Sequence, residues 1–170
     1  MPSYRLAPCP ASGTSNHTIG SSEGKEATPE CLFCAIAQGT TSAQIVFEDR
    51  TSLAFLDHRP VFLGHVLLVP KKHIETLGDL PESLTGPLFT SASMLSRAVQ
   101  TAMAAEGTFI AINNRVSQSV PHLHVHIVPR KRGDGLRGFL WPRTKYRDGA
   151  HAEEVRGAIA DAVRNQPGGS

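Results

Sequence analysis

The sequence predicts an α+β domain with an antiparallel sheet of about five strands, one long helix and a C-terminal helix. Three observations support this class. Several apolar segments have the length of strands, short turns join most of them, and one long stretch has apolar residues at helical spacing. Strands that follow one another through short turns pair antiparallel, whereas a doubly wound parallel sheet needs a crossover between strands.

The elements follow one another along the chain in a clear order. The segment CLFCAIA, which starts at Cys31, predicts a short helical turn. Apolar residues recur at helical spacing between Pro81 and Gly107, and Gly107 is a suitable stop for that helix. A last helix is expected at 151–165. Strands are expected at 43–49, 52–57, 61–70, 108–113 and 122–128.

Length and composition indicate one globular domain. The chain has 170 residues, of which 40% are hydrophobic and 19% charged. Residues 1–29 are rich in Ser, Gly, Thr and Pro, so we expect a disordered N-terminal arm. The functional domain is expected at 30–147, and a C-terminal helix with a disordered end at 148–170.

Other features of the composition bear on the compartment. No apolar run approaches the ~18 residues of a membrane span, and the first residues lack the apolar stretch of a signal peptide. Three cysteines are too few for a disulfide scaffold. These observations predict a cytoplasmic protein that does not interact with a membrane.

Positive charge is concentrated near the C-terminus. Residues 130–147 contain seven basic residues against one acid, Asp134. Such a stretch favours an anionic ligand, although a solvated loop has the same composition. No known nucleic-acid-binding module is present, so nucleic acid is not an expected partner.

Histidines alternate with apolar residues in HLHVHIV. In a strand, His122, His124 and His126 share one face. Three interpretations remain open at this point: a polar strand face without function, a zinc site with an activated water, and a histidine nucleophile that attacks phosphorus.

Several motifs together resemble the histidine-triad (HIT) family. The triad is preceded by Ser117-Gln118-Ser119-Val120, and CLFCAI, FED, LAFLD, GHVLLVPKKH and HLHVHIVPR occur in the order that bacterial members show. The resemblance covers about residues 31–130 and implies a HIT-like fold of the class predicted above. One segment departs from the family pattern. INNRVSQSV is shorter than the corresponding loop of many members and lacks its glycine.

The resemblance implies a catalytic role for four residues. Members bind purine nucleotides and release a nucleoside monophosphate, with the middle histidine, here His124, as the nucleophile. His126 matches the histidine at the α-phosphate, and His65 matches a fourth histidine at the phosphate. Ser119 matches a serine that relays a proton to the leaving group. This chemistry requires no catalytic metal in the family.

The resemblance also implies a nucleotide pocket. Asp57 matches the aspartate that binds the ribose hydroxyls, and Asn113 matches an asparagine at the phosphate. The full predicted set is Leu32, Phe33, Ile36, Phe55, Asp57, Asn113, Gln118, Ser119, His124 and His126.

Cys31-x-x-Cys34 is a single pair, which does not by itself fill a zinc site. Bacterial HIT proteins with this pair often hold a structural zinc ion, and the other two ligands match His73 and His122. A redox pair and two free thiols are the alternatives, but the βαβ pattern of a redox motif is absent from the sequence.

The activity that the resemblance implies is cleavage of a nucleoside monophosphate, AMP in the first instance, from a phosphate- or amine-linked leaving group. The enzyme is therefore expected to be a nucleoside phosphoramidate or dinucleoside polyphosphate hydrolase. The alternatives are a dinucleoside polyphosphate phosphorylase and a nucleotide-binding module with little turnover. The resemblance further implies a homodimer formed through the long helix.

Overall fold

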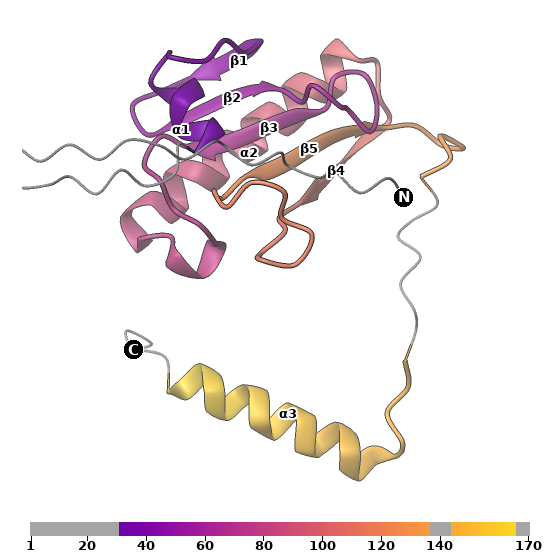
Figure 1. The fold of residues 1–170 in the computed structure, drawn as a ribbon. Coiled ribbons are helices and arrows are strands. Elements are labelled where there is room, and N and C mark those ends of the chain that lie inside the picture. Colours follow the sequence, from indigo (N-terminus) through magenta and orange to yellow (C-terminus); the bar gives the residue numbers. More distant parts are fainter. Residues whose placement is uncertain (1–30, 137–143, 166–170) are drawn as a thin grey trace, which may run out of the picture.

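The computed structural model describes residues 31–136 and 144–165, and it confirms the α+β class. Within these ranges, five strands form one antiparallel sheet in the order β1-β2-β3-β5-β4 (Figure 1). The predicted arm at 1–29 and the last residues of the chain lie outside the described ranges. The elements are α1 (Leu32–Ala37), β1 (Ile45–Glu48), β2 (Ser52–Leu56), β3 (Val66–Pro70), the 3-10 helix η1 (Leu77–Asp79), α2 (Glu82–Ala102), β4 (Gly107–Ala111), β5 (Val125–Arg130) and α3 (Gly149–Arg164).

Helix α2 covers one face of the sheet (Figure 1). Its buried stripe includes Leu88, Leu95 and Val99, which belong to one cluster with Val125 and Ile127 of β5. Burial of these side chains contributes ~25 cal/mol for each Å² of apolar surface removed from water. The remaining surface of α2 is exposed and, apart from Arg97, uncharged between residues 83 and 101.

The helix stop differs from the sequence prediction. Helix α2 ends at Ala102, and Ala104 follows with a φ of 46°, in the left-handed region that ends a helix. Gly107 is instead the first residue of β4. The prediction of Gly107 as the stop was therefore wrong, because an alanine adopts the terminating conformation.

Helix α1 packs over the opposite face of the sheet. Phe33 and Ile36 form a second buried cluster with Phe55, Leu67 and Val69. His126 stands opposite Leu67 in the β3–β5 register. Because paired residues share a face of the sheet, the side chain of His126 lies on this α1 side.

Strands β3 and β5 begin at Val66 and Val125, well after the predicted starts at 61 and 122. Strand β3 starts at Val66, because residues 61–65 form a turn in which the N–H of His65 donates to the carbonyl of Phe62 at 3.0 Å. Strand β5 starts at Val125, because the N–H of Leu123 donates to the carbonyl of Ile74 at 2.6 Å instead of to a neighbouring strand.

Gly64 supplies the positive φ that the turn before β3 requires. Its φ is +88°, and a Cβ there would lie 2.5 Å from Cγ of Met103. We expect Gly64→Ala to lower the free energy of unfolding by about 1–3 kcal/mol. Gly86→Ala is the matched control, since Gly86 lies within α2 with nothing within 4 Å of its Cβ position. It should raise that free energy by about 1 kcal/mol.

Chemical denaturation of the two variants and the parent chain measures both effects. A Gly64→Ala protein as stable as its parent would show that the turn relaxes without strain.

Two further observations concern the charge of α3 and the apolar character of the described helices. Helix α3 carries ion pairs between Glu153 and Arg156 and between Asp161 and Arg164. Among the described helices, none has both the length and the apolar character needed to cross a membrane.

Candidate active site

The three histidines gather beside α1, as the alternating pattern predicts. The ring of Phe33 lies 5.3 Å from the ring of His124 and 5.9 Å from that of His122. The rings of His124 and His126 lie 4.8 Å apart. His126 alone lies within β5, while His122 and His124 precede it in irregular backbone. The shared face is therefore produced by packing against α1 as well as by strand alternation.

The tautomer of His124 follows from one backbone contact. Its Nδ1 lies 2.7 Å from the carbonyl oxygen of His122. Because a carbonyl oxygen can only accept, Nδ1 carries the proton and Nε2 carries the lone pair. A buried imidazole whose Nδ1 carries the proton presents a bare Nε2, which is suited to act as a nucleophile.

His126 presents a nitrogen without a partner. Its Nδ1 lies 3.0 Å from Nε2 of His65, while its buried Nε2 has no hydrogen-bond partner among the described residues. Burial, with repulsion from His124 and His65, lowers the pKa of His126 to about 4. His126 is therefore neutral near pH 7, and the described residues leave the hydrogen-bonding capacity of its Nε2 unused.

Asp57 and His65 complete this cluster. Asp57 Oδ1 accepts the N–H of Arg59 at 2.8 Å, and Asp57 Oδ2 lies 3.3 Å from Nδ1 of His65. Burial lowers the pKa of His65, although the charge of Asp57 opposes that shift. One ligand atom from each of Asp57, His65 and His126 lies within 4.8 Å of the others.

The predicted base pocket is mostly core in this structure. Phe33, Ile36 and Phe55 are buried, and the rings of Phe33 and Phe55 make an edge contact at 5.4 Å. Leu32, at 44% exposure, is the member of this apolar set that faces solvent. Phe33, Ile36 and Phe55 therefore pack in the core between α1 and the sheet. Within this apolar set, Leu32 is the side chain exposed enough to contact a base.

The side-chain amides of Asn114 and Gln118 anchor the loop between β4 and the triad through hydrogen bonds. Gln118 Nε2 donates to the carbonyl of Glu75 at 2.7 Å, and Gln118 Oε1 accepts the N–H of Arg115 at 2.7 Å. Asn114 Oδ1 accepts the N–H of Leu77 at 2.8 Å. The sequence prediction did not include Asn114, and an asparagine in a loop carries no signal that identifies such a partner.

Backbone strain is concentrated in the same loop. Arg115 and Ser117 have φ values of 63° and 60°, which residues other than glycine rarely adopt. Strain of this kind persists where surrounding contacts impose it, and it clusters at functional sites. Between these contacts the loop leaves Asn113 half-buried and Ser119 exposed.

Four sulfur and nitrogen ligands converge at the start of α1. Nδ1 of His122 lies 3.4 Å from Sγ of Cys31 and 3.5 Å from Sγ of Cys34. Nδ1 of His73 lies 3.3 Å from Sγ of Cys34. A tetrahedral ion with bonds of ~2.0–2.3 Å places its ligand atoms ~3.3–3.8 Å apart. These contacts therefore match the dimensions of a metal-binding cluster.

The tautomer of His122 also fits a metal. Its Nε2 lies 2.9 Å from the carbonyl oxygen of Pro70, so Nε2 carries the proton and the lone pair of Nδ1 faces the thiols. Burial, with contributions from Cys31, raises the pKa of the Cys34 thiol to about 11. A bound cation would stabilise the thiolate that this environment otherwise disfavours.

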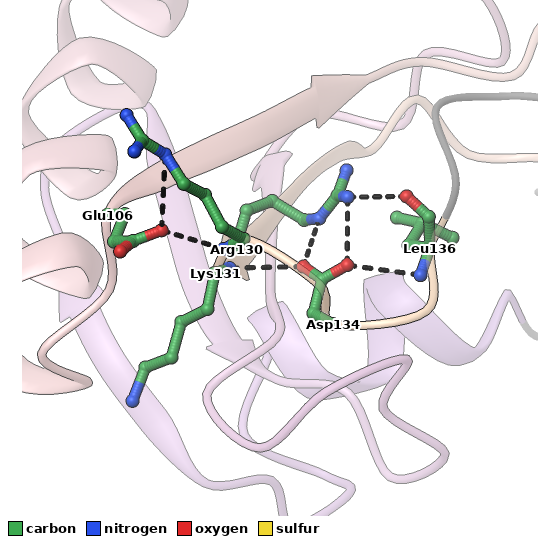
Figure 2. Close-up of polar contacts among 6 residues, drawn as sticks. Glu106, Arg130, Lys131, Asp134 and Leu136 are labelled. Atoms are coloured by element: carbon green, nitrogen blue, oxygen red, sulfur yellow. Dashed lines mark hydrogen bonds and ion pairs between the residues drawn. The ribbon is translucent and has the colours of Figure 1, made fainter.

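The basic stretch is partly neutralised within the protein (Figure 2). The guanidinium of Arg130 donates to both carboxylate oxygens of Asp134, at 2.5 and 2.9 Å. That hydrogen bonding holds the pKa of Asp134 down to about 2. Lys131 is exposed, and Nε of Arg132 lies 4.0 Å from Oε2 of Glu106. The guanidinium of Arg130 is thus engaged within its own turn by Asp134. Arg137 and Arg143, which belong to the same basic stretch, lie outside the described ranges.

A family model of the HIT domain matches residues 38–133. The chain belongs to the HIT family. A HIT-like protein of Mycobacterium tuberculosis is 38% identical over 135 residues, which cover 76% of this chain and 93% of that protein. Adenylylsulfatase HINT3 of Arabidopsis thaliana is 32% identical over 137 residues, or 79% of this chain and 68% of that protein.

Solved structures agree with the HIT fold. A zinc-bound histidine triad family protein from Mycobacterium smegmatis matches with a TM-score of 0.60 and 33% identity. The match covers 80% of this chain and 97% of that one. The predicted family and fold are thus confirmed, and in this HIT protein the first histidine of the triad, His122, also belongs to a Cys/His cluster.

Proposed function

We propose that this HIT protein is a nucleotide-binding hydrolase or transferase that releases a nucleoside monophosphate through a nucleotidyl-histidine. One observation carries the proposal: the ring of His124, with its bare Nε2, lies beside that of His126, whose buried Nε2 has no partner in the described part of the chain. A nucleophile next to a second polar group is the arrangement that covalent phosphoryl chemistry requires. The similarity to an adenylylsulfatase supports AMP as the released group.

The proposed reaction has two steps. Nε2 of His124 attacks the α-phosphorus, and the bond from phosphorus to the leaving group breaks, with Ser119 passing a proton to the leaving group. Water then attacks the same phosphorus and breaks the bond to Nε2. One proton of the water replaces the proton that Ser119 passed on, the oxygen stays on the released nucleoside monophosphate, and the imidazole is restored. His126 would contact the phosphoryl oxygens in both steps.

The nucleotide would lie along the α1 side of the sheet. Oδ2 of Asp57 is placed to accept from a ribose hydroxyl, since Oδ1 already accepts from Arg59. Leu32 would contact the base, and Asn113 would line the phosphate site. Both ends of the Gln118 amide are engaged within the protein, so we assign Gln118 to holding the loop that presents Ser119.

We assign a structural zinc ion to Cys31, Cys34, His73 and His122. Bound zinc would stabilise the thiolates and hold His122 in its observed tautomer. Four protein ligands leave no open position, so this ion would not itself bind water or substrate. The thiols must stay reduced to bind zinc, which favours a reducing compartment such as the cytoplasm.

A substrate panel tests the proposed activity. Adenosine phosphoramidate, diadenosine polyphosphates and aminoacyl adenylates would each be incubated with the protein, with and without inorganic phosphate, and the products identified. Release of AMP supports the hydrolase. Release of ADP only with phosphate would indicate the phosphorylase, and tight AMP binding without turnover would indicate a binding module.

We further propose a homodimer built on the edge strand β4 and on α2. Phe89 and Met94 of α2 are 41% and 38% exposed, and Ile110 of β4 is 43% exposed. Ile110 stands opposite Ile127, whose side chain lies in the core on the α2 side. The exposed apolar side chain of Ile110 therefore lies on the same face of the sheet as α2.

Light scattering at micromolar concentration should give about twice the chain mass, as expected for a two-fold dimer. Ile110→Glu should shift the protein to the monomer. The matched control is Val46→Glu on the opposite edge strand, where Val46 is 48% exposed. Dissociation by Val46→Glu alone would place the interface at β1.

A further inference from the structure

His65 connects the backbone of the β2–β3 turn to the catalytic histidines. It is 3% exposed, and each of its ring nitrogens faces a protein group. Nδ1 lies 3.3 Å from the backbone nitrogen of Val61, and Nε2 lies 3.0 Å from Nδ1 of His126. The protonation of one ring therefore determines what the next ring can donate.

The contact with Val61 sets the direction of this chain of hydrogen bonds. A backbone N–H can only donate, so Nδ1 of His65 must accept and holds a lone pair. A neutral imidazole then carries its proton on Nε2, which donates to Nδ1 of His126. The same rule places the proton of His126 on Nε2, the buried atom for which residues 31–136 and 144–165 supply no partner.

Asp57 is the group that would favour the opposite direction. Its Oδ2 lies 3.3 Å from the same Nδ1 of His65, but that contact is an ion-pair distance rather than a hydrogen bond. If His65 donated from Nδ1, the N–H of Val61 would face another N–H. Burial lowers the pKa of His65 and of His126, which disfavours the doubly protonated rings that could satisfy both neighbours.

We infer that the backbone N–H of Val61 and the ring of His65 are positioning groups that hold His126 as an Nε2–H donor. This inference rests on the proposed function, because a donor at this place serves an anionic phosphoryl oxygen. In the opposite tautomer, the lone pair of Nε2 would face that oxygen and repel it. His65 thus acts through His126 and needs no contact with the substrate.

Nitrogen-15 NMR of the imidazole rings in the ligand-free, full-length protein tests the inference directly. We expect His65 and His126 each to be protonated on Nε2 near neutral pH. His65→Gln should preserve the His126 tautomer, because the glutamine amide can still donate to Nδ1. His65→Leu should give a mixture of His126 tautomers. Protonation of His65 on Nδ1 in the parent protein would overturn the inference.

A second pair of variants tests the backbone group. Val61→Pro removes the backbone N–H. Val61→Ala retains that N–H and also replaces the valine side chain, which is exposed in the parent protein. We expect Val61→Pro alone to move the His65 proton to Nδ1, toward Asp57, and to reverse His126. An unchanged His126 tautomer in a folded Val61→Pro protein would exclude Val61 as the determinant.

Turnover gives an independent readout. His65→Leu should lower kcat by ~10- to 100-fold with little change in KM, as for outer-shell partners that orient a functional histidine. His65→Gln should recover most of that loss. The expected tautomers in a protein that never forms nucleotidyl-histidine would refute the proposed function and leave the hydrogen-bond chain intact. A reversed chain in an active enzyme would refute the inference alone.

Discussion

Replacement of His124 should lower turnover by ~10³-fold or more, because the reaction would lose its nucleophile. His124→Asn is the sharper variant. An asparagine amide can still donate to the carbonyl of His122, as Nδ1 does at 2.7 Å, but it has no counterpart of the nucleophilic Nε2. Loss of turnover in His124→Asn with unchanged AMP binding would therefore report on chemistry and not on packing.

A control variant and a labelling experiment accompany that measurement. His151→Ala removes a histidine on α3, outside the clusters described above, and should keep normal turnover. Brief incubation with a slowly hydrolysed adenylate donor should label His124 in the parent protein and leave His124→Asn unlabelled. Near-normal turnover in a folded His124→Asn protein would show that another group attacks the phosphorus.

Removal of zinc should cause the largest loss of stability. The four proposed ligands join the start of α1 to the segments after β3 and before β5. Structural zinc contributes apparent free energies of ~10–16 kcal/mol in small zinc-binding peptides. In this larger domain we expect a loss of at least ~3 kcal/mol, or ~6–12 °C in the midpoint temperature.

The measurement compares thermal unfolding of the purified protein before and after chelation, with elemental analysis of the same samples. The parent should contain about one zinc ion per chain, as four ligands imply. Cys34→Ser should unfold at a lower temperature than the parent and respond little to the chelator, because its site is already incomplete. A folded parent purified without chelator that contains no zinc would refute the metal assignment.

Much of the fold follows from local patterns. Five strands and two main helices were predicted because period-two and period-3.6 apolar spacing depends on neighbouring residues alone. The same spacing predicted that His122, His124 and His126 share a face, and the ring contacts confirm it. Element boundaries were less accurate at β3 and at the end of α2, where local turns interrupt the pattern, and at β5, where the distant carbonyl of Ile74 accepts the N–H of Leu123.

The site shows a similar division. The resemblance to the HIT family identified the residues that meet at the triad and at the Cys/His cluster, because its motifs can be matched residue by residue. The core placement of Phe33, Ile36 and Phe55 depends on how tightly α1 packs on the sheet. The engagement of Gln118 depends on the carbonyl of Glu75, which lies 43 positions away along the chain. A sequence motif specifies neither contact.

The sequence by itself determined the fold class and the order of the elements, because these depend on side-chain type and local period. Its resemblance to the HIT family, rather than any local period, indicated which distant residues form the Cys/His cluster. Only the tertiary structure decided the protonation pattern. The carbonyls of Pro70 and His122 and the N–H of Val61 set which nitrogen of each partner histidine carries the proton. Every residue except proline has the same backbone donor and acceptor, so folding alone decides which of them meets a histidine.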